Sequence, residues 1–557
     1  MKRYIVLAAA LLAMLSATAQ DTYENARVLG SDLNGTARYV GMGGALEALG
    51  ADISTMSTNP AGIGMFRHSY ASISFGGVNQ EEVNKFDNLG KTNLSFDQAG
   101  FVLTLNLFDE DAYVNFGFNY HKSRNFDQII QVNNRFAHAA SLNKLAFAKH
   151  TFGSDVAGGY SLGYNNYTNK WMGYRNLNEN NDYGYPFTQW DYLYHNVYNV
   201  DDQNTSEFPT GADHAMLFND ADNYYFDKSH RGWIADYDFN ISGNVHNRFF
   251  WGFTLGLHDI NYKGYSLYDE EIIDANGFST GTMVLEDERR ITGKGVDLKA
   301  GVIFLPFEES PFRIGLSVST PTWYEMKSEN YTVLHNNTAI PEGFKPWGYD
   351  NLSSDDVYEY KYYTPWKFGL SLGHTIGNYL ALGASYEYSD YSTADTRIYD
   401  GTYDEYDNEN SYSDRVMNNH TDRTLKGVSL LKLGAEFKPD PSIAVRLGYN
   451  YQSAAYNEKG FRDTTLDSPG TYFSSTPDYV NWKGTNRITA GFGYRVNKVS
   501  FDIAYQYSMT KGMFYPFQPD VEFRDSDPTG SFETNISTPS SLNFKRHQLL
   551  FTLGYTF

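Results

Sequence analysis

The sequence contains no cysteine among its 557 residues. Disulfides, thiolate metal sites, cysteine nucleophiles and acylation on cysteine are therefore excluded. After the N-terminus, no apolar run reaches about 18 residues, the length that a membrane-spanning helix needs. Basic residues are also scarce, because 44 Lys and Arg stand against 66 Asp and Glu, and the net charge is −22. We expect no nucleic-acid partner for so acidic a chain.

Motifs of the common enzyme classes are absent as well. The sequence has neither a G-x-S-x-G elbow nor a phosphate-binding loop. Its 13 histidines include no H-E-x-x-H pair. We therefore predict that the protein is not an enzyme and carries no metal and no cofactor.

The N-terminus has the three parts of a secretory signal. Lys2 and Arg3 are basic, residues 5–15 form an apolar run too short to span a bilayer, and residues 17–19 are small. We expect residues 1–19 to be a signal peptide and the mature chain to start at Gln20. A retained membrane anchor is the alternative.

Aromatic residues are abundant, at 17% of the chain with 46 Tyr and 38 Phe. Many segments alternate apolar and polar or small residues with the period of two that β-strands show. In residues 249–260, for example, Phe253, Leu255 and Leu257 alternate with Thr254 and Gly256. Fourteen strands are predicted, at residues 70–77, 98–108, 112–122, 231–243, 249–260, 293–306, 311–321, 363–375, 378–391, 427–438, 441–453, 485–496, 498–509 and 544–557.

The connections between these strands alternate between short turns and long polar segments. This pattern is typical of an all-β, 14-stranded antiparallel transmembrane β-barrel in the outer membrane, with short periplasmic turns and long extracellular loops. The largest loop would be residues 123–230. An even strand number places both termini in the periplasm. A β-sandwich, with its apolar faces inward, is the alternative.

The last strand also predicts an outer-membrane location. Leu549, Phe551, Leu553, Tyr555 and Phe557 alternate with small or polar residues, and the final residue is aromatic. This ending resembles the signal read by the barrel assembly machinery, which we therefore expect as a partner during biogenesis. Outer-membrane lipid would surround the finished barrel.

Residues 20–69 are not predicted to form membrane strands. They are rich in glycine and have too few apolar residues for an independent domain, so we expect a small hatch inside a barrel formed by residues 70–557. The candidate substrate-pocket residues are the apolar members of this hatch: Met42, Leu46, Leu49, Ile53, Met56, Ile63, Met65 and Phe66.

Two parts of the hatch carry a family resemblance. Residues 35–45, GTARYVGMGGA, followed by Asn59, Pro60, Ala61 and Gly62, resemble the start of the FadL/OmpP1/TodX family of outer-membrane transporters, in a form similar to its Bacteroidetes branch. Residues 312–321, 364–373 and 502–507 are similar in texture to later parts of the family. The resemblance implies a fourteen-stranded barrel with a hatch and the uptake of hydrophobic molecules that leave sideways through the barrel wall.

The Asn59–Pro60–Ala61–Gly62 motif has two interpretations. Proline restricts the residue before it, asparagine stabilises turns, and the small residues allow close packing, so the motif predicts a tight turn against the wall. A direct role in substrate passage is the second interpretation.

Charged residues at lumen-facing positions form another candidate group. They either hold the hatch by pairing with one another, or one Arg or Lys anchors a carboxylate head group. The candidates are Arg313, Lys367, Arg446, Arg487, Arg495, Glu387 and Asp502.

These features predict an outer-membrane channel for passive uptake of hydrophobic small molecules, such as long-chain fatty acids. The ligand would occupy an apolar pocket, displace the hatch and leave laterally. The alternative is a structural or assembly subunit that docks other outer-membrane proteins through its long loops.

Overall fold

The computed structural model describes residues 21–106, 112–146, 160–165, 170–177, 181–186, 188–197, 199–202, 215–216, 219–339, 344–346, 351–405, 409–466, 468–518, 521–523 and 533–557. None of the helices in these ranges is long and apolar enough to cross a membrane.

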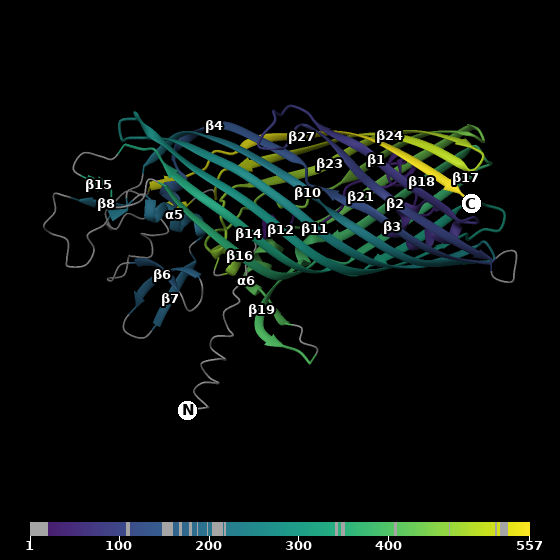
Figure 1. The fold of residues 1–557 in the computed structure, drawn as a ribbon, viewed down its shortest axis with the longest axis horizontal. Coiled ribbons are helices and arrows are strands. Elements are labelled where there is room, and N and C mark those ends of the chain that lie inside the picture. The colour runs from purple at the N-terminus through teal and green to yellow at the C-terminus, as the bar shows by residue number, and fades with distance from the viewer. Residues whose placement is uncertain are drawn as a thin grey trace.

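A closed antiparallel barrel with fourteen wall positions dominates the structure, which confirms the predicted fold class (Figure 1). The barrel closes because the last strand pairs with the first, from Tyr70 opposite Thr556 to Gln80 opposite Arg546. Three positions each hold two strands in succession, separated by a break. In order, the wall consists of β1 (Tyr70–Gln80), β2 (Thr92–Asn106), β3 (Tyr113–Asn125) with β4 (Gln128–Ala140), β10 (Asp220–Val245), β11 (Phe249–Ile273), β12 (Ser279–Phe304), β13 (Arg313–Ser319) with β14 (Trp323–Asn336), β16 (Asn351–Tyr363) with β17 (Lys367–Ile376), β18 (Leu380–Asp390), β21 (Gly427–Asp440), β22 (Ile443–Gln452), β23 (Tyr479–Val496), β24 (Val499–Tyr515) and β27 (Ser540–Thr556).

Smaller elements are attached at the end of the barrel away from the short turns or lie along its side (Figure 1). The smaller elements are β5 (Tyr160–Asn165), β6 (Lys170–Leu177), β7 (Asn181–Pro186), α5 (Gln189–Val197), β8 (Asn199–Asp202), β9 (Ala215–Met216), β15 (Phe344–Pro346), η3 (Tyr391–Thr393), β19 (Asp395–Tyr403), β20 (Glu409–Ser413), α6 (Arg415–Thr424), α7 (Pro469–Tyr472), β25 (Val521–Phe523) and β26 (Glu533–Asn535). Of these, β19 and β20 form a hairpin that projects sideways from the wall (Figure 1).

All fourteen predicted strands are present, but many continue further toward the loops than predicted. Strands β10, β11 and β12 have 26, 25 and 26 residues, whereas about 9–11 residues suffice to cross a membrane. The predicted large loop 123–230 was therefore wrong at both ends, since β4 and the start of β10 belong to the wall. The same holds for the connection between the predicted strands 249–260 and 293–306, most of which is a hairpin of β11 and β12.

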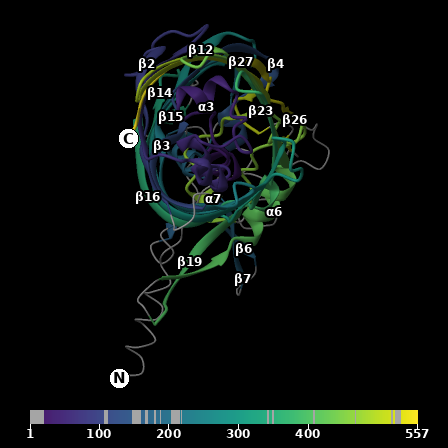
Figure 2. The same cartoon turned by 90° about the vertical axis from the view of Figure 1, so that its right-hand side faces the viewer.

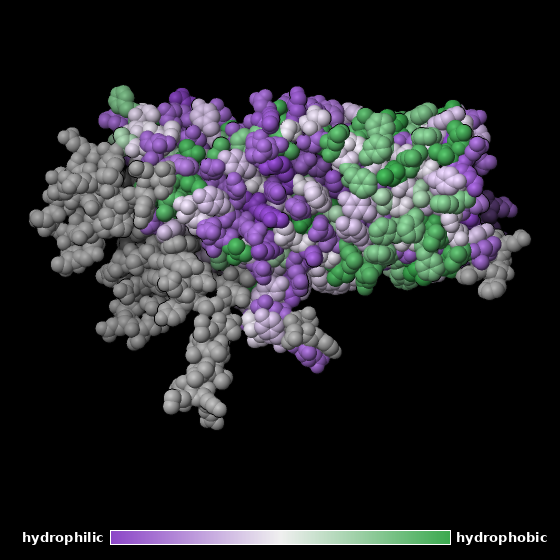
Figure 3. All heavy atoms as spheres, in the orientation of Figure 1, coloured by the Kyte–Doolittle hydropathy of each residue, from purple (hydrophilic) through white to green (hydrophobic). Residues whose placement is uncertain are grey.

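The outer surface of the barrel differs between its two ends. Apolar side chains form a belt around the half that carries the short turns, here called the short-turn half, and the remainder, the loop half, is mainly polar outside (Figure 3). In the belt, Phe253 is 57% exposed and Leu447 is 64% exposed. Such a band suits contact with lipid hydrocarbon.

The inner surface shows the opposite distribution. On β11, Phe253 and Leu255 face outward in the short-turn half, whereas Tyr262, Tyr268 and Ile272 are buried inside the loop half. The buried apolar residues of the loop half form two clusters: Tyr262 belongs to one, and Tyr268 and Ile272 belong to the other, which also contains Trp190 of α5. The loop half is thus packed like a water-soluble domain.

Residues 21–69 lie in the lumen and form the predicted hatch (Figure 2). Its elements are α2 (Thr22–Asn25), α3 (Ala37–Gly41), η1 (Ile53–Ser57) and η2 (Pro60–Met65). We call residues 21–34 the strap and residues 35–69 the hatch body.

The two ends of the described chain lie in different halves. The barrel wall begins and ends at the short turns, where the Phe557 amide donates a hydrogen bond to the Ser69 carbonyl (2.9 Å). Asp21 instead pairs with Arg462 in the loop half. The predicted signal peptide and the predicted N-terminus at Gln20 lie outside the described residues, so the periplasmic location of both termini stays a prediction.

Candidate functional site

The hatch body is seated directly against glycines of the wall. A side chain at Gly252 would overlap the backbone of Pro60, and one at Gly301 would overlap the side chain of Asn59. The Asn59 side chain accepts a hydrogen bond from the Ala61 amide (3.2 Å) and caps η2, and Pro60 takes its first position. The motif therefore forms the tight, close-packed turn of the first interpretation. The role in substrate passage stays a prediction.

The eight apolar hatch residues occupy the short-turn half. Seven are buried and pack in two separate clusters, while Met65 is partly buried against a third cluster formed by Ala61, Phe250 and Ile303. None of them lines the two interior cavities described below. Their role as a substrate pocket stays a prediction, which would require the hatch body to move.

Several predicted lumen charges hold the hatch body. Arg446 bonds Glu436 (2.6 Å) and Asp502 (2.5 Å), and Glu436 also pairs with Arg38 of the hatch (3.2 Å). Arg313 donates to the carbonyl of Leu49 (2.9 Å). These contacts tie the plug to the wall by charge-assisted hydrogen bonds.

The strap is held by polar contacts in the loop half. Glu24 pairs with Arg289 and lies 3.7 Å from Arg462. Burial alone would raise the pKa of Glu24, but these arginines lower it to about 2. Thr22 bonds His420 and Thr421 of α6, each at 2.9 Å. The strap is thereby bound to loops as well as to the wall.

Two cavities lie beside the strap. Cavity A, of about 90 Å³, has a mixed polar and apolar lining that includes Lys367 and Glu387 of the predicted charges. Cavity B, of about 200 Å³, has aromatic walls that include Tyr262, Tyr456 and Trp482. Arg487, another predicted charge, lines both cavities. Arg495 is exposed at the short-turn rim and lines neither.

Three arginines at cavity B form no salt bridge with a described residue, although Asp32 lines the same cavity and interacts electrostatically with Arg124 and Arg487. Arg487 donates to Asn450 (2.9 Å) and Gln452 (3.2 Å), Arg124 to the carbonyl of Leu29, and Arg27 to Tyr262 (2.7 Å). Among the described residues, no carboxylate oxygen lies within 4 Å of these guanidinium groups. A cavity with aromatic walls and such arginines can accept an amphipathic anion.

Sequence reasoning missed Arg27, Arg124 and the aromatic wall of cavity B. Arg27 lies in the hatch, but Arg124 and most of the aromatic residues fall in segments interpreted as loops. The period of two does continue through Tyr262, although the apolar residues there occupy the other face of the strand. A search for strands whose apolar residues switch from one face to the other could have found Arg124 and these aromatic residues.

Within the described ranges, no group of three or more His, Asp or Glu side chains could hold a metal ion.

The wall is interrupted between β2 and β3. Their pairing stops at Gln98 opposite His121 on the way to the loops. The strap takes the vacant edge of β3: the Asp32 amide donates to the Ser123 carbonyl (2.8 Å), and Asn34 donates to the Lys122 carbonyl (2.9 Å) and to Asp97 (3.0 Å). Polar contacts from the strap therefore seal this interruption.

The closed wall, the apolar belt and the internal plug define a membrane-spanning β-barrel with an obstructed lumen. No family model and no curated protein sequence matches the chain. Among solved structures, it is similar to the Ralstonia pickettii toluene transporter TbuX (11% identity, TM-score 0.48, 94% of this chain and 99% of that one) and the P. putida toluene transporter TodX (10%, 0.48, 94% and 99%). A Pseudomonas aeruginosa FadL homologue is also similar (12%, 0.44, 95% and 99%). These similarities are weak, and the barrel is established by its own strand pairing.

Proposed function

We propose that this protein is an outer-membrane channel for passive uptake of hydrophobic small molecules, with long-chain fatty acids as the favoured class. The observation that carries the proposal is cavity B, where aromatic side chains adjoin Arg27, Arg124 and Arg487. Aromatic walls bind an apolar body, and an arginine that forms no salt bridge binds a carboxylate through its planar set of donors.

The size of the cavities implies that the strap moves. Small-molecule sites usually measure about 300–1,000 Å³, whereas cavities A and B measure about 90 and 200 Å³. Residues of the strap line both, so its withdrawal would join and enlarge them. The ligand would arrive from the loops, bind as the strap withdraws and leave through the wall, since the hatch body fills the lumen below.

The test compares two arginines. Arg487→Met removes a cavity cation, and Arg495→Met removes one at the rim. A lost charge-assisted hydrogen bond of about 1.5–3 kcal/mol corresponds to roughly 10–100-fold in affinity. We expect R487M to weaken palmitate binding to the purified barrel by that factor and to slow palmitate uptake by cells, with hexadecanol binding nearly unchanged. R495M should behave as wild type.

Equal palmitate binding by R487M and wild type would refute the role of cavity B, provided that both variants migrate as folded barrels in unheated gels.

Removal of residues 21–58 tests whether the hatch must be displaced during uptake. If this deletion leaves uptake and binding identical to wild type in correctly folded protein, hatch displacement is not part of the pathway.

A second candidate function is that of an assembly subunit. The observation in its favour is the β19–β20 hairpin, whose strand β20 pairs only with β19 among the described strands and leaves an edge open for another chain (Figure 1). Isolation of the barrel from solubilised outer membranes separates the functions. A stoichiometric protein complex lost on deletion of residues 398–412 would favour the subunit, and copurified fatty acid would favour the channel.

A further inference from the structure

Two neighbouring wall strands break at the same level. Pairing of β13 with β17 ends at Ser319 opposite Lys367, and pairing of β14 with β16 resumes at Trp323 opposite Tyr363. Pro321 lies between β13 and β14, and Pro365 lies between β16 and β17. Proline has no amide hydrogen to donate to the ladder. Two hydrogen bonds bridge the break, from the Thr322 amide to Thr364 Oγ1 (2.8 Å) and from the Thr364 amide to the Thr322 carbonyl (3.1 Å).

The outer face of this double-proline break carries an apolar groove. The groove measures about 330 Å³, within the usual range for a small-molecule site. Trp366, from the break itself, is 50% exposed at its edge. The other apolar side chains that line it come from four strands of the belt: Phe239, Ile241, Phe253, Leu255, Leu298, Ala300 and Val318.

Cavity A reaches the same break from inside. Its lining includes Thr322, Thr364, Pro365 and Lys367. Lys299 of β12 is among the residues that line both cavity A and the outer groove, so at this point the two spaces lie on opposite sides of the same stretch of wall. Next to Lys299, the ladder between these two wall positions is interrupted from Ser319 and Lys367 to Trp323 and Tyr363.

The break differs from the interruption between β2 and β3. There, Asp32 and Asn34 of the strap replace the missing strand with hydrogen bonds. At the double-proline break, no hydrogen bond from a described hatch residue reaches residues 319–323 or 363–367. An apolar molecule would have to displace the buried contacts of the strap at the first site, which is costly, whereas at the second it would have to break only the two hydrogen bonds between Thr322 and Thr364.

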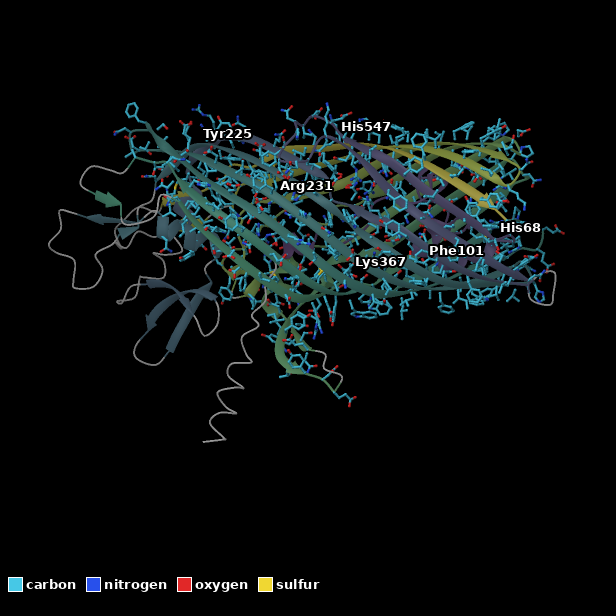
Figure 4. All side chains as sticks on the ribbon, viewed as in Figure 1. His68, Phe101, Tyr225, Arg231, Lys367 and His547 are labelled. Carbon is cyan, nitrogen blue, oxygen red and sulfur yellow. The ribbon has the colours of Figure 1, made fainter. Side chains whose placement is uncertain are left out.

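Lys367 supplies a charge beside the break. It faces inward, on the same side of β17 as Ser371, and lines cavity A about midway along the barrel (Figure 4). Within the described residues, no carboxylate oxygen lies within 4 Å of its ammonium group. The neighbouring Lys299, in contrast, is paired with Asp238 (2.9 Å) and Asp297 (3.2 Å).

We propose that the double-proline break is the lateral port of the channel and binds a long-chain carboxylate on its way out. The alkyl chain occupies the outer groove, and the carboxylate stays at Lys367 until the molecule passes into the membrane. This inference rests on the proposed function, because it gives the location of the exit that uptake requires.

The absence of cysteine from the natural chain allows a direct test. The pair Thr322→Cys and Thr364→Cys places two thiols across the break. The matched pair Ser371→Cys and Ser385→Cys crosses the uninterrupted β17–β18 ladder, where the two serines face each other and line neither cavity. Palmitate binding to each purified barrel and palmitate uptake by cells are measured after oxidation and after reduction.

We expect oxidation of the first pair to lower uptake at least tenfold while binding stays within twofold of the reduced protein, and reduction to restore uptake. The oxidised control pair should take up palmitate at the reduced rate. Unchanged uptake after complete oxidation of the first pair, shown by mass spectrometry, would place the port elsewhere. Failure of the wild-type barrel to bind or take up palmitate would instead refute the proposed function itself.

A second variant tests the head-group site without a cross-link. Lys367→Met should reduce palmitate uptake severalfold and leave uptake of hexadecanol unchanged, because only the carboxylate needs the ammonium group. Arg495→Met is the control, since that cation lies at the rim. An equal reduction for both molecules, or no reduction for palmitate, would overturn the assignment of Lys367.

Discussion

The short-turn half and the loop half of the barrel share the same strands but have opposite polarity. On β10, Phe239 faces outward in the short-turn half, whereas Phe226 faces inward in the loop half and packs 4.7 Å from Phe514, measured between ring centroids. The direction of each side chain still alternates along the strand, so the backbone is the same in both halves. The solvent decides the difference: hydrocarbon surrounds one half and water surrounds the other.

The two halves also hold the hatch differently. In the short-turn half, the hatch body approaches the wall backbone at glycines such as Gly383 and Gly434. In the loop half, the strap is held by buried ion pairs and hydrogen bonds that include Glu24 and Thr22. Close packing favours one rigid position, whereas polar contacts can be exchanged for water. We therefore expect the strap to move before the hatch body does.

The largest expected effect concerns the core of the loop half. Phe226→Ala should lower the free energy of unfolding by about 3–5 kcal/mol, because it leaves a cavity in packed surroundings. Phe239→Ala, on the same strand, should cost only about 1–2 kcal/mol, since lipid fills the space. Urea unfolding in lipid vesicles measures both. Equal losses would mean that the loop half is not packed like a soluble core.

The next effect concerns the outer surface. Leu255→Arg, within the belt, should cost about 2–4 kcal/mol, the range for a cation near the bilayer midplane. Tyr225→Arg, on the outward face of the loop half (Figure 4), should change stability by no more than about 0.5 kcal/mol. The same unfolding measurement applies. A comparable loss at Tyr225 would place lipid around both halves.

A smaller effect depends on pH. Because the pKa of Glu24 is lowered from 4.5 to about 2, its ionised form stabilises the fold above pH 4.5, and this contribution disappears as the pH falls toward 2. Glu24→Gln should be less stable than wild type by on the order of 2–3 kcal/mol at pH 7, with the gap closing between pH 4.5 and 2. The rate of protease cleavage within the strap, measured as a function of pH for both proteins, reports this difference in stability. A gap independent of pH would contradict the ion pairs.

The smallest effect concerns the seat of the hatch body. A Cβ at Gly383 would overlap the carbonyl of Ala45, so Gly383→Ala should cost about 1–3 kcal/mol by overpacking. At Gly90, in contrast, the nearest atom to an added Cβ is 3.8 Å away, and Gly90→Ala serves as the control. Thermal unfolding and protease access to the hatch compare the two. Equal stability would show that the hatch body is loosely held.

How far the sequence predicted the fold can be judged from individual strands. In residues 249–257, lipid requires apolar side chains at every second position, so the pattern predicted that part of β11 correctly. Beyond Ile260, the apolar residues occupy the opposite face, and the interpretation as loop was wrong. Arg124 was missed for the same reason, because it follows a segment whose outward pattern had ended.

Only part of the candidate site could be predicted. Lys367, Glu387 and Arg487 were recognised from their inward parity, and all three line a cavity. Arg446 and Arg313 share that parity but hold the hatch body instead. The position of a residue in the alternating pattern tells which side of the wall it faces. Its partner depends on which hatch residue lies opposite it in the folded barrel.

By itself, the sequence determined the number of strands, their alternation of turns and loops, and the presence of a plug, because each depends on local patterning against lipid or on composition. The tertiary structure alone decided where the strands end, which charges pair among the described residues, and where the ladder of the wall is interrupted. These properties depend on contacts between residues far apart in the chain, such as Glu24 with Arg289 or Thr322 with Thr364. No local pattern encodes such contacts.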